Sequence, residues 1–527
     1  MHDNELLLLG LMAAVVALNA LARVVHVPYP ILLVVGGLLL GELPGIPNVE
    51  LDPDLVLILF LPPLLYAGAF FSSLRDLRAD LRGISMLAIG LVLVTTCVVA
   101  IVAHAMIDGL PWAAAFALGA IVAPTDPVAA SAIMRRLGVH RRIVTAVEGE
   151  ALINDGTALV AYRVAVAAAV GGSFSAWHAG LEFVAAAAGG IAIGLVVGWL
   201  VAQVRKRLED PPVEITISLF TGYMAYLPAD RIGASGVLAV VAAGIYLGWR
   251  APELSSASTR MQAFSFWEIL IYLLNSSLFI LVGLQLGPIL NGIDNFDTGT
   301  LVGYAAIISA VVIAVRIVWQ FTVPYVIRAL DRRPSQVARR AGAGPRFLVA
   351  WSGMRGAVSL AAALALPLET DAGAPFPHRD VLIFITFGVI FATLVIQGVT
   401  LPLLVRTLPV EADGAEESEE VAARVAAAAA ALARLEELGA EEWTRDDTVE
   451  RLRNLYRYRK RRFAARAGKI EDDGYEDRSL AYQQLLHELL AAQRLALVQL
   501  RNDGVISSEV MRRVERDLDL EETRLEI

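Results

Sequence analysis

The sequence predicts an all-α polytopic membrane protein with about 13 transmembrane helices, inverted repeats and a C-terminal cytoplasmic helical tail. The prediction depends on composition, on thirteen apolar stretches and on the charge of the connections between them. Of the 527 residues, 57% are hydrophobic and 18% are charged, whereas soluble domains carry about 25% charged residues. The net charge of -9 does not favour nucleic-acid binding, and the single cysteine, Cys97, excludes disulfides and cysteine-based metal sites.

The apolar stretches are long enough to cross a bilayer, which takes about 20 residues in a helix. In chain order they lie at residues 5–24, 28–46, 54–71, 83–107, 112–134, 143–170, 179–204, 213–229, 234–249, 265–289, 300–329, 346–369 and 379–408.

The connections between these stretches alternate in charge. Basic residues gather in one set, near Arg75, Arg135, Arg205, Arg250 and Arg332, and the other set carries mainly acidic residues, such as Asp52, Asp108, Asp294 and Glu369. Because basic loops stay in the cytoplasm, the pattern predicts an outside N-terminus and a cytoplasmic C-terminus. The alternation holds along the whole chain only for an odd number of spans, which favours thirteen.

The composition changes after Pro409. We therefore divide the chain into a membrane domain, 1–408, and a cytoplasmic helical domain, 409–527. An alanine-rich segment at 421–438 favours a helix, and 451–466 is basic with interleaved aromatic residues. We expect this tail to serve in dimer contact or regulation, or its basic segment to lie on anionic lipid headgroups.

Two prolines interrupt the fifth apolar stretch, in Ala123-Pro124-Thr125-Asp126-Pro127. Neither proline donates a backbone hydrogen bond, and each disfavours helix in the residue before it. The helix should break near Thr125–Asp126, and such backbone is tolerated at membrane depth only where it is buried in protein or lines a cavity. Transporters build ion sites at breaks of this kind. The alternative is a simple kink with Asp126 capping the second half-helix.

The sixth apolar stretch carries several polar residues. At about 100° per residue, Glu150 and Asn154 share one face, whereas Asp155 points roughly 140° away from Glu150. Asp155 lies about 18 Å from the cytoplasmic end of the helix, close to mid-membrane, where an acidic group is a functional-site hypothesis.

We interpret Asp155 as the ion- and proton-binding group, with Thr125, Asp126 and Asn154 as supporting oxygens. Asp155 and Asp126 are the candidate ligands of a monovalent cation. Hard cations prefer such an all-oxygen setting over histidine or cysteine.

Glu150 needs a separate partner, and Arg316 in the eleventh stretch is the candidate for a structural ion pair, because removing one member of a buried pair costs about 3–5 kcal/mol. The alternative for Arg316 is that its side chain extends to the membrane interface. Glu148, nearer the cytoplasm, is interpreted as vestibule lining. Arg163 and Asn275 are interpreted as structural hydrogen-bond partners.

The twelfth stretch contains Gly353-Met354-Arg355-Gly356. This pattern suits a second broken helix, the counterpart of the fifth span in an inverted repeat, with Arg355 as a counter-charge. Close glycine packing with Arg355 near the cytoplasmic end is the alternative.

With these residues in place, the sequence resembles the sodium/proton antiporters of the NhaP/NHE branch of the monovalent cation/proton antiporter superfamily, in its bacterial form. The resemblance extends over roughly residues 10–408. It rests on Leu61-Pro62-Pro63-Leu64-Leu65, Pro124-Thr125-Asp126-Pro127, Glu148-Gly149-Glu150, Asn154-Asp155-Gly156, Arg316 and Gly353-Met354-Arg355-Gly356.

The resemblance implies a cation/proton antiporter domain with crossed broken helices in spans 5 and 12, and a homodimer that moves a core domain by an elevator-like motion. It also implies that Asp155 binds the ion or the proton, near Thr125, Asp126 and Asn154, and that Glu150 pairs with Arg316.

Departures from the family pattern concern the ion. Ala151 replaces a serine that many relatives carry, and Ala67 and Gly68 replace a nearby acidic residue. Asn154 before Asp155, in place of a second aspartate, is typical of the electroneutral branch. If Asn154 cannot titrate and Glu150 stays paired, one carboxylate binds either a proton or a cation.

The function that we expect is exchange of Na⁺ for H⁺ in pH homeostasis at the plasma membrane, with Li⁺ and K⁺ as other candidate ions. A K⁺/H⁺ antiporter is the nearest alternative, and a cation channel with a regulatory tail belongs to a different class. We expect no enzymatic activity and no cofactor. The expected partners are monovalent cations, protons, membrane lipid and a second copy of the chain.

Overall fold

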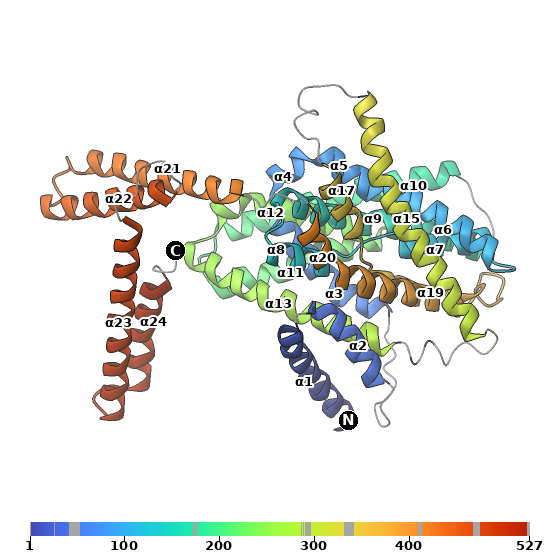
Figure 1. Cartoon of the computed structure of the whole chain (residues 1–527), viewed down its shortest axis with the longest axis horizontal. Coiled ribbons are helices and arrows are strands. Elements are labelled where there is room, and N and C mark those ends of the chain that lie inside the picture. Colours follow the sequence, from blue (N-terminus) through green and yellow to red (C-terminus); the bar gives the residue numbers. More distant parts are fainter. Residues whose placement is uncertain are drawn as a thin grey trace. The chain divides into compact units, whose positions relative to one another are not determined.

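The structure is a computed structural model that describes residues 2–25, 27–41, 53–171, 176–285, 287, 289, 297–330, 342–408, 414–466 and 475–523. The contacts divide the chain into two compact units, Met1–Ala412 and Asp413–Ile527. Within the described ranges the regular secondary structure is helical, apart from an isolated bridge between Glu369 and Pro375 (Figure 1). The predicted basic connection at Arg332 and the acidic residues Asp52 and Asp294 lie outside the described residues.

The helices of the first unit are α1 (His2–Val25), α2 (Tyr29–Gly41), α3 (Pro53–Phe70), α4 (Leu74–Ala79), α5 (Leu81–Ser85), the π-helix η1 (Met86–Leu91), α6 (Val92–Met106), α7 (Trp112–Val122), α8 (Val128–Arg136), α9 (Arg141–Gly171), α10 (Ala176–Arg205), α11 (Pro211–Arg231), α12 (Gly236–Leu254), α13 (Ala257–Leu284), α15 (Thr298–Leu330), α17 (Ala343–Trp351), α18 (Ala357–Leu364), α19 (Arg379–Ala392), the π-helix η2 (Thr393–Gln397) and α20 (Gly398–Thr407).

Within the described residues, each of the thirteen apolar stretches overlaps one helix or consecutive helical segments. Among the described residues, seven helices are long and apolar enough to cross a membrane, and four shorter apolar helices accompany them. The prediction of an all-α polytopic membrane protein is confirmed. The count of thirteen spans stays a prediction. The twelfth stretch is shorter than predicted: α18 ends at Leu364, and the chain then forms a turn region that precedes α19.

The helices of the first unit pack in two groups. One hydrophobic cluster contains Leu118 of α7, Val144 of α9, Ile308 of α15 and Phe384 of α19. A second cluster is built from α3 and α10–α13, with Trp267 of α13 at less than 2% exposure. Helices α3 and α13 contribute to both clusters. They therefore lie where the two groups meet.

Close packing inside the second group depends on small residues. A Cβ added at Gly194 of α10 would collide with the carbonyl oxygen of Ala239 in α12, and one at Gly248 of α12 would collide with that of Phe70 in α3. Small residues let helix backbones approach closely in a membrane.

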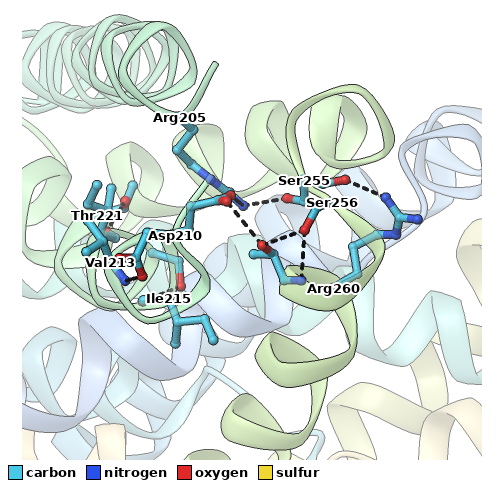
Figure 2. Close-up of polar contacts among 12 residues, drawn as sticks. Arg205, Asp210, Val213, Ile215, Thr221, Ser255, Ser256 and Arg260 are labelled. Carbon is cyan, nitrogen blue, oxygen red and sulfur yellow. Dashed lines mark hydrogen bonds and ion pairs between the residues drawn. The ribbon is translucent and has the colours of Figure 1, made fainter. Parts of the chain in front are cut away.

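A buried ion-pair network joins the ends of α10–α13 (Figure 2). Arg205 donates from Nη2 to Glu214 at 3.3 Å and to the Ser255 hydroxyl at 2.6 Å. Thr259 donates to the other Glu214 oxygen at 3.1 Å. The side chains of Arg205 and Glu214 are 4% and 1% exposed, so a charge pair ties four helix ends together at a point from which water is excluded.

Side-chain caps set where these helices begin. Asp210 accepts a hydrogen bond from the Val213 amide, and Pro211 occupies the first turn of α11, where a missing N–H costs nothing. Ser256 accepts from the Thr259 amide at 3.1 Å and caps α13. Free amides at helix starts are satisfied in this way.

The second unit contains α21 (Gly414–Leu438), α22 (Asp446–Arg466), α23 (Tyr475–Asn502) and α24 (Ser508–Thr523). Helices α21 and α22 are joined by Arg453, which donates to both oxygens of Glu436 at 2.7 and 2.9 Å. Helices α23 and α24 are joined by Arg494, which pairs with Asp519 at 2.6 Å and with Glu522.

Candidate functional site

The fifth apolar stretch is broken where the prolines predict. Helix α7 ends at Val122 and α8 begins at Val128, with non-helical backbone between them. Oδ1 of Asp126 accepts a hydrogen bond from the Val128 amide at 2.9 Å. The structure therefore contains both the break and the capping contact that were considered as alternatives.

The twelfth stretch is broken in the same way between α17 and α18, at residues 352–356. The two breaks touch: the backbone amide of Asp126 donates to the carbonyl of Met354 at 2.7 Å. Arg355, 1% exposed, donates from Nε to the Val122 carbonyl at 3.0 Å and from Nη1 to the Gly353 carbonyl. The Arg355 guanidinium thus donates hydrogen bonds to one free carbonyl at each break. Arg355 therefore lies at the crossing rather than at a helix end.

Glycine is required on both sides of Arg355. A Cβ at Gly353 would collide with the Arg316 side chain, and one at Gly356 would collide with the Asp126 carboxylate. The glycines of the Gly-Met-Arg-Gly sequence therefore make room for two of the charged residues singled out in the sequence.

Glu150 and Arg316 form a buried ion pair, each 1% exposed. Nη2 of Arg316 donates to Oε2 of Glu150 at 2.7 Å, and Nη1 donates to Oε1. Arg316 also donates to the Val349 carbonyl at 3.1 and 3.2 Å. The Arg316 side chain therefore does not extend to the membrane interface.

Thr125 connects this pair to the break. Its hydroxyl donates to Oε1 of Glu150 at 3.1 Å and accepts from the Asn154 amide nitrogen at 2.9 Å. Nδ2 of Asn154 also donates to the Thr125 carbonyl at 3.2 Å. Asn154 is fully buried and does not line the cavity described below. The structure places Asn154 behind Thr125, where it orients the break.

Asp155 lies on the other face of α9, as the 100° turn per residue predicts. It lines a cavity of about 340 Å³ together with Thr125 and Asp126. Within the described parts of the chain, the Asp155 carboxylate makes no hydrogen bond or ion pair. Asp155 differs in this from Glu150, whose charge is neutralised by Arg316.

The cavity lies where the two groups of helices meet. One wall comes from α8, α9 and α18, with the break before α8, and the other from α3 and α13. Glu148 lines the cavity with Arg135, which donates to both Glu148 oxygens at 2.8 Å.

The structure adds residues that the sequence did not single out as site residues. Ser359 of α18 lines the cavity, and so does Asn275 of α13, which was interpreted as a structural partner. Asn275 forms no hydrogen bond with any described residue. In the sequence, the signal that could have identified Asn275 is a polar side chain inside an apolar run. Arg163, by contrast, has the structural role expected of it, in an ion pair with Asp230.

The π-helix η2 borders the crossing. The hydroxyl of Thr393 accepts from the Arg355 amide at 3.1 Å. Gln397 is fully buried, and neither polar atom of its amide has a partner among the described residues. Nothing in the amino-acid pattern distinguishes a π-helical turn from an α-helical one, although such turns are frequent at functional sites.

Most of the membrane unit matches the model of a known protein family. The model of the family described as "Sodium/hydrogen exchanger, transmembrane" matches residues 10–407. The chain is 38% identical over 524 residues to an uncharacterized Na⁺/H⁺ exchanger of Mycobacterium tuberculosis, covering 98% of this chain and 95% of that one. It is 35% identical to a sodium, potassium, lithium and rubidium/H⁺ antiporter of Bacillus subtilis, over 76% of this chain and 61% of that protein.

Among solved structures, the fold is similar to that of the sodium proton antiporter MjNhaP1 from Methanocaldococcus jannaschii. The TM-score is 0.56 at 19% sequence identity, and the match covers 77% of this chain and 99% of that one. The match of the family model over most of the membrane unit, together with the sequence identity to exchangers along nearly the whole chain, shows that this protein belongs to the sodium/hydrogen exchanger family.

Proposed function

We propose that Asp155 is the group at which this cation/proton exchanger binds either Na⁺ or H⁺, but never both. The protein is a multi-pass membrane transporter rather than an enzyme. The observation that supports the proposal is the contrast between the two acidic faces of α9. Glu150 is neutralised by Arg316, whereas Asp155 faces a cavity without a partner among the described residues.

The cavity offers the oxygen ligands that a monovalent cation needs. Thr125 and Asp126 line it beside Asp155, and hard cations prefer oxygen ligands. Asn154 acts one step behind, through the hydrogen bonds that hold Thr125. Arg355 supplies positive charge at the crossing and holds the carbonyls of both breaks. No cofactor enters this scheme.

Competition for one carboxylate gives electroneutral exchange. Glu150 keeps its partner, Asn154 does not titrate, and Asp155 changes between a protonated and a cation-bound form. Each turnover then moves one positive charge in each direction. Asp126 caps the start of α8 with one carboxylate oxygen and stays in place as a supporting ligand.

Access alternates through movement of the helices that carry the site against α3 and α13. The position of the cavity between these two sets of helices supports this, as does the general design of transporters around broken helices at mid-membrane. We propose further that the chain is a homodimer in the plasma membrane with its N-terminus outside and its tail, from residue 409, in the cytoplasm.

The transported ion is proposed from charge and from relatives. Na⁺ is the first candidate. The name of the Bacillus subtilis relative supports Li⁺, K⁺ and Rb⁺ as further ions to test, and a K⁺/H⁺ antiporter is the outcome if K⁺ alone drives exchange.

The test uses purified full-length protein in liposomes that contain a pH-sensitive dye. A Na⁺ gradient should move protons in the wild type and not in Asp155→Asn. Asp230→Asn is the matched control, because it removes an aspartate of a partly exposed ion pair outside the cavity and should leave exchange intact. Exchange that survives in Asp155→Asn contradicts the proposal, and unitary currents in a planar bilayer would indicate a channel.

A further inference from the structure

The cavity carries an ion pair far from the crossing. Arg135, in the last turn of α8, donates to Glu148 of α9 through Nε at 3.2 Å and through Nη2 at 2.8 Å to each carboxylate oxygen. Both residues line the cavity. Among the described residues of its wall, Arg135 is the basic member, and Asp126, Glu148 and Asp155 are the acidic ones.

Glu148 and Asp155 belong to the same face of α9. Seven residues at about 100° per residue amount to two turns within about 20°, and the rise between them is about 10 Å. Ala151 and Leu152, between them, also line the cavity. A cation that travels along this face therefore meets one carboxylate near the helix start and a second one about two turns deeper.

The two ion pairs of α9 differ in burial. The side chains of Arg135 and Glu148 are 66% and 29% exposed, whereas those of Arg316 and Glu150 are 1% exposed. Exposed pairs contribute little free energy and are screened by salt. The Arg135–Glu148 pair is therefore one that a dissolved cation can open, which the buried pair is not.

We propose that Glu148 is a second, exchangeable cation site at the mouth of the cavity, and that Arg135 is the resident counter-ion that an entering monovalent cation displaces on its way to Asp155. This inference rests on the proposed function, because an entry site at Glu148 supplies cations to Asp155. The Arg135 side chain competes with the cation for Glu148 and therefore raises the cation concentration at which the entry site is half occupied. The Glu148 carboxylate raises the local cation concentration at the entrance that leads to Asp155.

The test measures the Na⁺ concentration for half-maximal exchange, at fixed pH, with full-length protein in liposomes. Arg135→Gln frees Glu148 and should lower this concentration by up to about five-fold, the range that an exposed ion pair can supply, with an unchanged maximal rate. Glu148→Gln should raise it, also without loss of maximal rate. Arg135→Lys keeps the charge and should resemble the wild type.

Two controls separate the entry site from general effects of surface charge. Arg142→Gln removes another exposed bidentate pair, between Arg142 in the first turn of α9 and Asp80, that does not line the cavity, and it should change nothing. Added choline chloride screens Glu148, so the gain in Arg135→Gln should shrink as the choline concentration rises.

An unchanged half-maximal concentration in both Arg135→Gln and Glu148→Gln overturns the inference, and so does a fall in maximal rate in Arg135→Gln at an unchanged half-maximal concentration. These results leave the proposed function standing as long as Asp155→Asn abolishes exchange. Exchange by Asp155→Asn contradicts the proposed function instead, whatever the two mouth variants do.

Discussion

At the scale of single residues, the site depends on which face of α9 a carboxylate occupies. Glu150 and Asp155 are five residues apart, and this spacing directs them to different neighbours. Glu150 meets Arg316 and the Thr125 hydroxyl, and Asp155 meets the cavity. The helical turn, rather than residue type, separates the paired acid, Glu150, from Asp155, the acid that we propose binds the ion.

Arg316→Met should destabilise the protein by about 3–5 kcal/mol, because it leaves Glu150 buried with an uncompensated charge. Thermal unfolding in detergent, followed by circular dichroism, measures the loss. The double variant Arg316→Met/Glu150→Gln removes both charges and should be more stable than the single variant. Equal stability of the two would contradict this reason for the loss, because the unpaired Glu150 charge would then not be its cause.

Gly356→Ala should abolish Na⁺-driven proton movement, at least ten-fold below the wild type. The added Cβ would occupy the space of the Asp126 carboxylate, so Asp126 and the start of α8 must shift. Dye-based exchange in liposomes checks this. Gly303→Ala is the control, because nothing lies within 4 Å of a Cβ at Gly303, and its exchange should match the wild type.

At the scale of elements, the second group of helices is held by the network of Arg205, Glu214, Ser255 and Thr259, where α10–α13 meet (Figure 2). These residues lie outside the cavity. Their contribution is to the rigidity of one wall rather than to ion binding.

Glu214→Ala should lower the unfolding temperature strongly, because it leaves Arg205 buried without its carboxylate, at a cost of about 3–5 kcal/mol. The protein that remains folded should keep the wild-type Na⁺ concentration for half-maximal exchange. A changed ion affinity with an unchanged unfolding temperature would contradict the structural role.

The helix pair α23 and α24 should respond to acid. Hydrogen bonds and charge from Arg494 lower the pKa of Glu522 from its ordinary value of 4.5. A lowered folded-state pKa stabilises the contact above the unfolded value and loses that stabilisation as pH falls through the folded value. The protection of the α24 amides, measured as their exchange rate relative to the intrinsic rate at the same pH, should therefore fall as the pH drops below about 4.5. Arg494→Gln should abolish this fall.

At the scale of the whole membrane unit, the cavity lies where the two packed groups of helices meet, with α8, α9 and α18 on one wall and α3 and α13 on the other. Gly68 of α3 and Leu152 of α9 are neighbours across it: a Cβ at Gly68 would lie 3.2 Å from the Leu152 side chain. A link between these positions joins the two walls that move apart in the proposed mechanism.

Gly68→Cys/Leu152→Cys, in a Cys97→Ser background, should be cross-linked by a short thiol reagent and lose exchange. A reducible reagent allows recovery of exchange after reduction. Each single cysteine variant, treated in the same way, serves as the control. Exchange that persists in fully cross-linked protein would contradict movement between these walls.

Much of this architecture was predictable because a membrane restricts the choices of the chain. Long apolar runs have to form helices, Pro124 and Pro127 have to interrupt one of them, and an angle of 100° per residue separates Glu150 from Asp155. The position of Asn154 behind Thr125 was not predictable, because it depends on how the break folds back on α9. The place of Asn275 on the far wall depends on packing between distant helices, which no local pattern encodes.

The hydrogen bonds at the crossing constrain how an ion can be moved. Arg355 and the Asp126–Met354 backbone contact fasten one discontinuous helix to the other, so neither can be displaced without dragging its counterpart. In the proposed mechanism the residues that hold the ion therefore move as one unit. The proposed site stays assembled while access to it changes from one side of the membrane to the other.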